Sequence, residues 1–338
     1  MPASRLTICS VSFRSGHFLD LNWKLTAALN PQPLPAWLVV DNTPPGPRAP
    51  GDSPSCPFTI LPGVPPPSGM PEKVLGSYHH AAALQTALAH VATRYLLILD
   101  PDFYIVQPGW VQRIVGHMET HGLAFFGVPW HPRWFVKYRG FPCVHCMFID
   151  TEQVKIDALD FSPDGLAPGR FRTAWKTLER KTPRALWSSY LGMRRLFLTL
   201  TQAGRLQIGQ TADTGTRVFR RFGADGKTRA EIATPVFDET REALAPAQAR
   251  TGFARRFERL LPARFRYFPE PGACTARGFA GRGLQDARAL GCEEFVWRDE
   301  PFGFHYRQTA QAATPEASRK DAVENLIAAF LSRTPLPR

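Results

Sequence analysis

Residues 95–103 read YLLILDPDF, and this stretch decides the predicted fold. The apolar run 95–99 has the length of a buried strand, and it ends abruptly in Asp100, Pro101 and Asp102. Open α/β sheets bind ligands at the carboxyl ends of their strands, so two carboxylates at this place can hold a hard divalent cation. The alternative is a solvated turn, because Asp and Pro are common turn residues.

The sequence before this strand predicts the sheet that it joins. LTICSVSF at 6–13 and WLVV at 37–40 have the composition of strands. Between them, Leu21, Leu25 and Leu29 have helical spacing. A strand, a helix and a second strand in this order predict a parallel pair.

Further helices and strands continue this alternation. Helices are predicted over 76–94 and from Pro108 to Gly122, and strands over 123–128 and 146–150. The fold class is therefore α/β, with a mostly parallel central sheet flanked by helices.

Other parts of the chain are less regular. Residues 44–71 contain eleven prolines and are expected to form an extended loop outside the packed sheet. The second half holds an apolar helix around 186–200 and a final helix, with Thr314 as its cap and Pro315 in its first turn.

The composition narrows the class of partner. The 338 residues carry a formal charge of +12, which attracts the phosphates of nucleotide sugars, nucleic acids and anionic lipids alike. Six cysteines dispersed over a long chain suit a reducing compartment. No signal-peptide pattern and no apolar run of about 20 residues is present, so we expect a cytoplasmic protein.

Three ordered features resemble the family 2 glycosyltransferases and their GT-A relatives: VSFRSG at 11–16, VVDN at 39–42 and LLILDPDF at 96–103. The resemblance extends to about residue 150 and implies a GT-A fold. We therefore expect residues 1–150 to bind a nucleotide-sugar donor. Residues 151–338 would bind the acceptor and supply the C-terminal helices, within one continuous domain.

The resemblance also implies roles for individual residues. Ser12, Phe13 and Asp41 would line the pocket for the base, although Asp41 has an Asx turn as its alternative. Asp100 would face the ribose or the metal, and Asp102 would be the principal metal ligand. The metal would be Mn²⁺ or Mg²⁺, which neutralises charge on a leaving diphosphate.

Residues further along the chain complete the predicted site. His80 would contact phosphate, and His305 resembles the late histidine that completes the metal site in GT-A enzymes, with Arg307 beside it to meet phosphate. Asp213, in QTADTGTRVF, is the candidate general base for the acceptor hydroxyl. Capping of the helix that follows is the alternative role of Asp213.

Two short motifs, one aromatic and one with cysteines, each have two interpretations. The segment 130–134, WHPRW, offers aromatic faces and a cation for stacking on a sugar, or it is a packed loop. Cys143 and Cys146, with His145 between them, lack a second ligand pair at zinc spacing. We therefore interpret them as part of a buried strand.

The segment 253–268 alternates arginine with phenylalanine and leucine. Such a basic amphipathic face can lie peripherally on an anionic inner membrane, which would suit a lipid-linked acceptor. The alternative is a solvated helix packed on the core.

The sequence thus predicts a metal-dependent, inverting glycosyltransferase that acts on a carbohydrate or lipid-linked hydroxyl, as in bacterial polysaccharide or glycolipid synthesis. A sugar-phosphate nucleotidyltransferase would need a Gly-rich basic loop, whereas residues 11–17 hold only Gly16 and Arg14. The remaining alternative is a non-catalytic protein that binds carbohydrate or nucleic acid, with nucleic acid the less favoured partner.

Overall fold

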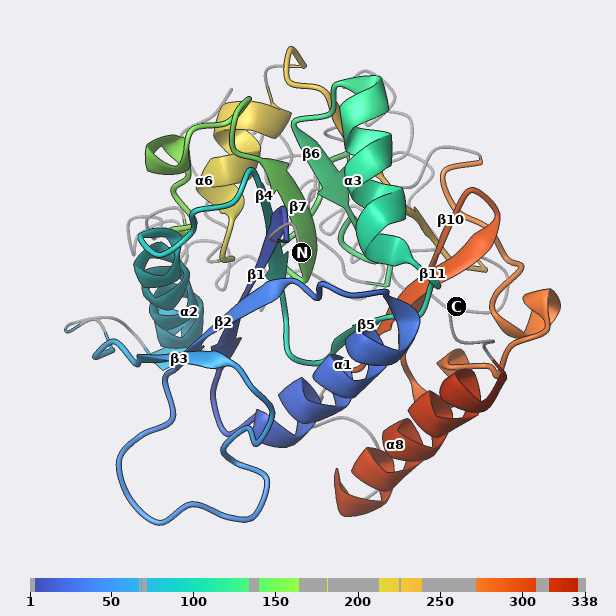
Figure 1. Cartoon of the computed structure of the whole chain (residues 1–338), viewed down its shortest axis with the longest axis horizontal. Coiled ribbons are helices and arrows are strands. Elements are labelled where there is room, and N and C mark those ends of the chain that lie inside the picture. The colour runs from blue at the N-terminus through green and yellow to red at the C-terminus, as the bar shows by residue number, and fades with distance from the viewer. Residues whose placement is uncertain are drawn as a thin grey trace.

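The computed structural model describes residues 4–66, 68, 72–133, 140–163, 181, 213–224, 226–238, 272–307 and 316–333. Figure 1 shows the arrangement of the elements. In chain order they are β1 (Leu6–Ser12), α1 (Gly16–Leu29), β2 (Ala36–Asp41), β3 (Thr59–Pro62), α2 (Glu72–Leu88), β4 (Tyr95–Leu99), β5 (Phe103–Ile105), α3 (Trp110–His121), β6 (Phe125–Gly127), β7 (Cys146–Asp150), η1 (Ile156–Ala158), α6 (Thr216–Val218), η3 (Phe219–Gly223), β8 (Ala230–Ile232), β9 (Thr234–Pro235), η5 (Ala280–Arg282), η6 (Arg288–Leu290), β10 (Glu293–Trp297), β11 (Glu300–His305) and α8 (Glu316–Arg333).

The main sheet has seven strands in the order β3-β2-β1-β4-β7-β6-β8. All neighbouring pairs are parallel except the two that involve β7, which runs antiparallel to β4 and to β6. Helices lie on both sides of the sheet, α2 on the left and α3 on the right of Figure 1. The predicted α/β fold with a mostly parallel central sheet is confirmed.

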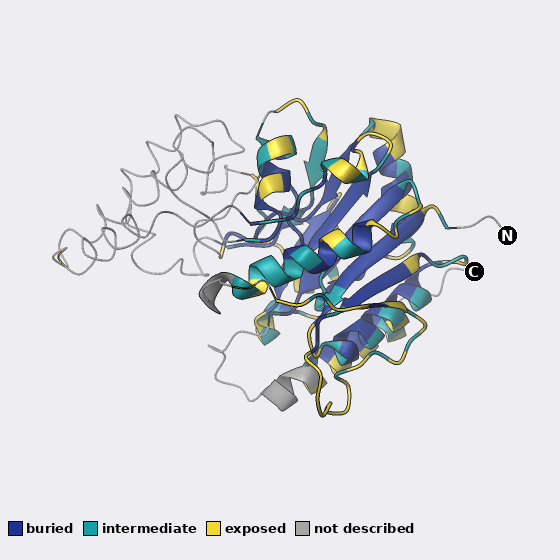
Figure 2. Cartoon of the chain, turned by 90° about the vertical axis from the view of Figure 1, so that its left-hand side faces the viewer, coloured by how far each residue is buried: buried dark blue, intermediate teal, exposed yellow. Residues whose placement is uncertain are grey.

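Strand β4 lies in the middle of this sheet, and all five of its residues are buried. Figure 2 shows the buried strands between helices whose outer faces are exposed. A strand covered on both faces needs apolar side chains throughout, as the run YLLIL provides. Full burial of one leucine side chain stabilises the folded chain by about 1.5–3 kcal/mol. This segment is therefore most stable at the centre of the sheet.

Helix α3 follows its predicted boundaries closely. Trp110, Ile114 and Met118 are buried on one face. The helix ends at Gly122, whose φ of 57° is left-handed and whose N–H caps the carbonyl of Glu119. A glycine adopts this conformation without a steric penalty, so the helix terminates where the sequence predicts.

The second sheet is antiparallel, in the order β5-β11-β10-β9. Strand β5 begins directly after Asp102, and its Phe103 pairs with His305 of β11. His305 in turn pairs with Glu293 of β10. These pairings bring residues from near the end of the chain to the turn that follows β4.

The proline-rich segment departs from the expectation in one place. Residues Thr59–Pro62 form β3, which pairs with β2 at the edge of the main sheet, so the prediction of a loop outside the sheet was wrong for these residues. Within β3 only Leu61 is buried, and Ile60 is 48% exposed. An edge strand tolerates proline because one side of its backbone has no partner strand.

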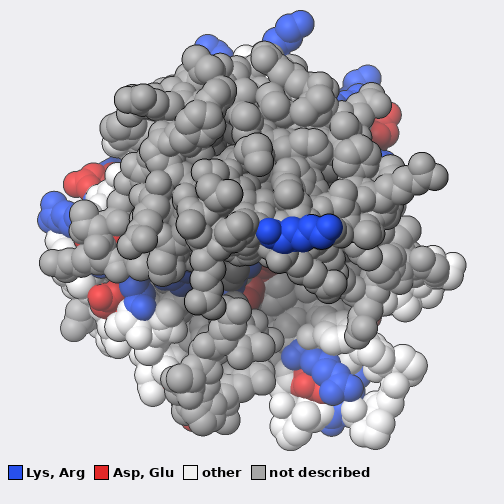
Figure 3. Space-filling model, turned by 180° about the vertical axis from the view of Figure 1, so that it is seen from behind, with Lys and Arg blue, Asp and Glu red and all other residues white. Residues whose placement is uncertain are grey.

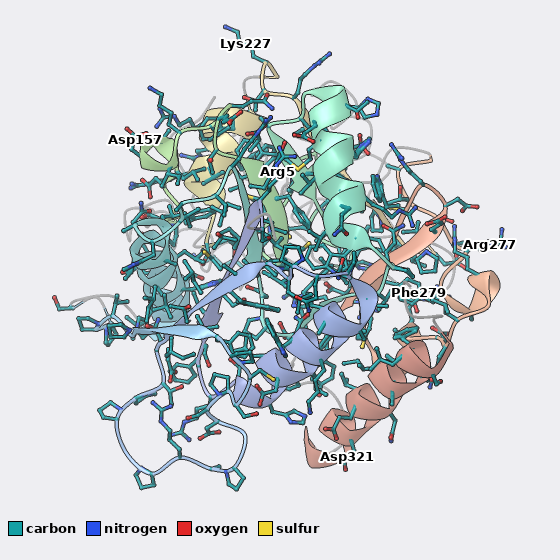
Figure 4. All side chains as sticks on the ribbon, in the orientation of Figure 1. Arg5, Asp157, Lys227, Arg277, Phe279 and Asp321 are labelled. Atoms are coloured by element: carbon teal, nitrogen blue, oxygen red, sulfur yellow. The ribbon has the colours of Figure 1, made fainter. Side chains whose placement is uncertain are left out.

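The described segments near the C-terminus pack against the rest of the fold. Phe279 lies beside α8 in Figure 4, and its ring centroid is 6.0 Å from that of Phe330. Strand β8 pairs with β6, so the second half of the chain contributes to the main sheet. The proposed division at residue 150 stays a prediction.

Several predicted features lie outside the described residues: Trp134, the helix around 186–200, the segment 253–268, Thr314 and Pro315.

Among the described helices, none has the length and apolarity that crossing a membrane requires. On the face shown in Figure 3, described side chains of both charge signs are scattered around the edges, and one basic side chain lies near the centre.

Asp150, the last residue of β7, is fully buried and joins the ends of two strands. It accepts hydrogen bonds from Arg94 Nη2 at 2.9 Å and from Gln153 Nε2 at 2.9 Å. Burial alone would raise the pKa of Asp150, but these hydrogen bonds lower it below its ordinary value. Arg94 directly precedes β4, so the pair fixes the register between β4 and β7.

We predict that Asp150→Asn lowers the free energy of unfolding at pH 7 by about 2–4 kcal/mol, because Arg94 loses its buried partner. The carboxylate has a lower pKa in the folded chain, so its contribution is complete above the unfolded pKa of about 3.9. That contribution is lost as the pH falls through the folded pKa. Urea denaturation between pH 3 and pH 7 should therefore show the difference from wild type shrinking toward acid.

The exposed Asp157, labelled in Figure 4, provides the matched control. Asp157→Asn should change stability by less than about 0.5 kcal/mol at every pH. An equal loss in Asp150→Asn at pH 3 and pH 7 would contradict the ionic role of Asp150.

Candidate functional site

The antiparallel direction of β7 brings a histidine to the turn after β4. Leu99, the last residue of β4, pairs with Cys146, the first of β7. The preceding His145 therefore lies beside Asp100, whose N–H donates to the His145 carbonyl at 3.0 Å. A strand that starts where its neighbour ends adds its leading residue to the carboxyl edge of the sheet.

The second sheet adds another histidine to the same place. His305 is the last residue of β11 and pairs with Phe103, directly after Asp102. The main-chain N–H of Tyr306 donates to the carbonyl of Asp102 at 2.9 Å.

Asp100, His145 and His305 offer ligand atoms that all lie within 4.8 Å of one another. The set contains one carboxylate oxygen and two imidazole nitrogens. Imidazole suits the first-row transition ions, whereas Mg²⁺ prefers oxygen ligands in an octahedron. The residues therefore fit a divalent cation.

His305 is buried between two carboxylates. Its Nε2 lies 3.2 Å from Asp102 Oδ1 and its Nδ1 lies 3.3 Å from Glu293 Oε2. Burial alone would lower the pKa of His305, but Asp102 and Glu293 raise it to about 9. A carboxylate on the second nitrogen of a ligating histidine fixes the orientation of the ring, and Glu293 has this position.

Negative charge is concentrated at the turn after β4. Burial and then the neighbouring Asp102 raise the pKa of Asp100 well above its ordinary value. His80 Nε2 lies 3.8 Å from Asp100 Oδ1, and burial lowers the pKa of His80 to about 4. A neutral His80 leaves the acidic charge of the turn available to a cation.

Two cavities adjoin at this turn, with volumes of about 390 Å³ and 340 Å³, each within the range of small-molecule sites. The first lies at the ends of β1 and β2, and Phe13, Asn42 and His79 are among its lining residues. The second is bounded by Asp100, His145 and His305, which are called the metal-ligand cluster below. His80, Asp100 and Asp102 line both cavities.

The predicted base-pocket residues have different surroundings. Phe13 lines the first cavity and is 58% exposed, and Ser12 is buried at the end of β1. Asp41 is not among the residues that line either cavity. Its Oδ1 accepts the N–H of Thr43 at 3.0 Å, as in an Asx turn, and its Oδ2 lies 2.8 Å from Arg48 Nη1. Contact between Asp41 and a base stays a prediction.

Asp213 lines the second cavity together with Thr214. Thr214 Oγ1 donates to the carbonyl of Ser77 at 3.0 Å, which ties this loop to α2. The cap position of α6 is Gly215, with a φ of 83° and no side-chain cap hydrogen bond. The predicted base residue therefore lies in the same cavity as the metal-ligand cluster, and its role as base stays a prediction.

Trp130 and Arg307 also line the second cavity. The guanidinium carbon of Arg307 lies 5.2 Å from the centroid of the Trp130 ring, so the cation covers one face of the indole. His131 is buried, with its Nε2 3.1 Å from the carbonyl of Val236.

Sequence reasoning assigned no ligand role to His145. It correctly placed Cys146 in a strand, and Cys143 and Cys146 are buried, but it treated their histidine as part of the same packed segment. His145 Nδ1 lies 3.3 Å from Cys143 Sγ, while Nε2 lies 3.8 Å from Asp100 Oδ2. Knowing that β7 runs antiparallel to β4 would have placed His145 beside Asp100.

Asn22, in α1, fixes the main chain of the turn. Its side chain is 1% exposed, and Nδ2 donates to the carbonyls of Phe103 at 2.7 Å and Pro101 at 3.4 Å. These carbonyls flank Asp102, so Asn22 constrains the backbone from which that carboxylate projects.

Comparisons with known proteins leave the function open. No family model and no curated protein matches the chain. A similar solved structure is the mannosyltransferase PcManGT from Pyrobaculum calidifontis in complex with GDP-Man and Mn²⁺, with 14% identity, a TM-score of 0.37, and coverage of 78% of this chain and 77% of that one.

TarS 1–349 of S. aureus has 15% identity and a TM-score of 0.29 over 46% of this chain, and its complex with UDP-GlcNAc has 13% and 0.28 over 46%. The chain spans about half the length of these TarS chains, 50% and 48%. Similarity at this level does not assign a function to the chain.

We predict that Asn22→Ala weakens Mn²⁺ binding by about tenfold, because the carbonyls that hold the turn lose their donor. Both the binding constant, measured by calorimetry, and the melting temperature should fall. Asn30→Ala is the matched control, since Asn30 is also buried and bonds Thr26 and Val111 far from the turn. It should cost similar stability, about 1–2 kcal/mol, and leave Mn²⁺ affinity intact. Equal losses of Mn²⁺ affinity in the two variants would contradict a positioning role for Asn22.

Proposed function

We propose that the chain is a metal-dependent glycosyltransferase with a GT-A type of fold, which transfers a sugar from a nucleoside diphosphate to an acceptor hydroxyl. The observation that carries this proposal is the convergence of Asp100, His145 and His305 ligand atoms within 4.8 Å, beside two adjoining cavities. In such an enzyme the sugar donor and the acceptor would each occupy one cavity, and the cation would lie between them beside the leaving diphosphate.

The first cavity is the proposed nucleoside site. It adjoins the carboxyl ends of parallel strands, the usual ligand position in an open α/β sheet. Phe13 offers an exposed ring for stacking on the base, and Ser12 and Asp41 end the two strands beside it. The 390 Å³ volume suits a nucleoside with its first phosphate.

The residues shared by both cavities are the proposed diphosphate position. Asp100, His145 and His305 would hold a divalent cation, and Asp102, the ligand expected from the sequence, lies 3.2 Å from Nε2 of His305 and would face the same cation. Such a cation neutralises the negative charge that develops on a leaving diphosphate. Arg307 supplies a permanent positive charge nearby, and its planar guanidinium matches two phosphate oxygens.

The second cavity is the proposed site of transfer. Asp213 would accept the proton of the acceptor hydroxyl as that oxygen forms a bond to the anomeric carbon. The bond from the anomeric carbon to the diphosphate breaks at the same time, and attack from the opposite face inverts the configuration. Trp130 also lines this cavity, but it is 6% exposed and Arg307 covers one face of its indole.

The acceptor is proposed to be a carbohydrate or a lipid-linked hydroxyl. Peripheral membrane contact through 253–268 remains part of this proposal and concerns residues outside those described.

We predict that Mn²⁺ together with UDP, GDP or dTDP raises the melting temperature of the wild type, because ligands that bind only the folded chain stabilise it. One nucleotide should act most strongly and so identify the donor base. The rise should disappear in Asp100→Asn and in His145→Ala, which each lose one cation ligand. His117→Asn is the control, since His117 is a buried histidine that bonds Glu231 outside the cluster.

Asp213→Asn should retain the stabilisation by Mn²⁺ and nucleotide and lose transfer by at least about a hundredfold, since general bases contribute 10²–10⁴ in rate. Single-turnover transfer from the matching sugar nucleotide measures this step. No stabilisation of the wild type by any metal and nucleotide would favour a non-catalytic binding protein instead.

A further inference from the structure

Arg307 contacts the nitrogen of His145 that faces the cation site. Its Nη2 lies 3.1 Å from His145 Nε2, and its Nε lies 3.7 Å from Glu293 Oε1. The guanidinium is also stacked over Trp130. Three neighbours therefore hold the cation of Arg307 in one orientation.

The two ring nitrogens of His145 have distinct partners. Arg307 has only donors and cannot deprotonate, so His145 Nε2 must accept, and Nδ1 then carries the ring proton and faces Cys143 Sγ at 3.3 Å. Nε2 is also the atom that lies 3.8 Å from Asp100 Oδ2. The one acceptor atom of the ring thus faces both Asp100, where a cation would bind, and Arg307.

A neutral imidazole has a single acceptor lone pair, which cannot serve a guanidinium and a cation together. We propose that Arg307 competes with the divalent cation for Nε2 of His145, and that a bound diphosphate removes this competition by binding the guanidinium. The inference rests on the proposed function and adds a coupling between its two ligands.

The energetic consequence is reciprocal. If the diphosphate withdraws Arg307 from His145, then the cation binds more tightly when nucleotide is present, and nucleotide binds more tightly when the cation is present, by the same factor. Before the nucleotide arrives, Arg307 satisfies His145 and opposes a second positive charge beside it. An arginine that only contacts phosphate would leave the affinity for the cation alone unchanged when it is replaced.

The test is a calorimetric titration of Mn²⁺ alone into wild type and Arg307→Met, which keeps a long side chain over Trp130 and removes charge and donors. We expect Arg307→Met to bind Mn²⁺ about 5- to 20-fold more tightly than wild type. The gain should vanish when His145→Ala is added. Arg113→Met is the control, because Arg113 pairs with Glu300 at the far end of β11 and its loss should leave Mn²⁺ affinity within about twofold.

Arg307→Gln separates the occupied nitrogen from net charge. Glutamine loses the charge but keeps N–H donors that can bond Nε2, so a smaller gain than in Arg307→Met is expected. An equal gain in Arg307→Gln and Arg307→Met would assign the effect to charge and overturn the competition for Nε2. Unchanged or weaker Mn²⁺ binding in Arg307→Met would also overturn it.

A second titration repeats the measurement with saturating UDP or GDP. The factor by which the nucleotide raises Mn²⁺ affinity should be smaller in Arg307→Met than in wild type, because the variant has no competition to remove. If wild type and variant bind Mn²⁺ equally and nucleotide raises both alike, the inference fails and the proposed cation site stands. If neither binds Mn²⁺ with or without nucleotide, the proposed function itself fails.

Discussion

The site depends on one reversal of direction, the antiparallel pairing of β7 between β4 and β6. Parallel strands present only their carboxyl ends to a common edge, and those ends are joined to loops and helices. By starting at that edge, β7 adds His145 without any intervening loop. The main chain of this histidine is fixed directly before the strand, because its carbonyl accepts the N–H of Asp100 at 3.0 Å.

The second constraint is electrostatic. Asp100, Asp102 and Glu293 lie around two imidazoles and one guanidinium, and each of these three nitrogen groups has a carboxylate within 4 Å. Buried charges are stable only when they are paired. The same residues therefore satisfy one another in the folded chain.

Much of the fold follows from local sequence, and the site follows only in part. Buried β4, the amphipathic face of α3 and its Gly122 terminus are all determined by neighbouring residues, so pattern reasoning predicts them. The direction of β7 and the pairing of β5 with β11 depend on contacts between distant segments. Hence Asp100 was predictable as a site residue from its strand, whereas His145 required knowledge of strand order. The edge strand β3 was missed because proline content argues against a strand unless its edge position is known.

The pairing of β11 with β5 has a consequence for how the chain matures. Asp102 and His305, whose side chains lie 3.2 Å apart, are separated by 203 positions in sequence. Synthesis proceeds from the N-terminus, so β1, β2 and β4 leave the ribosome long before His305 exists. Contacts of such long range form late, after the entropy of closing the intervening chain has been met. An unfinished chain thus has Asp100 and Asp102 without the histidine that pairs with Asp102, and the full cluster of carboxylates and imidazoles is assembled only at the end of folding.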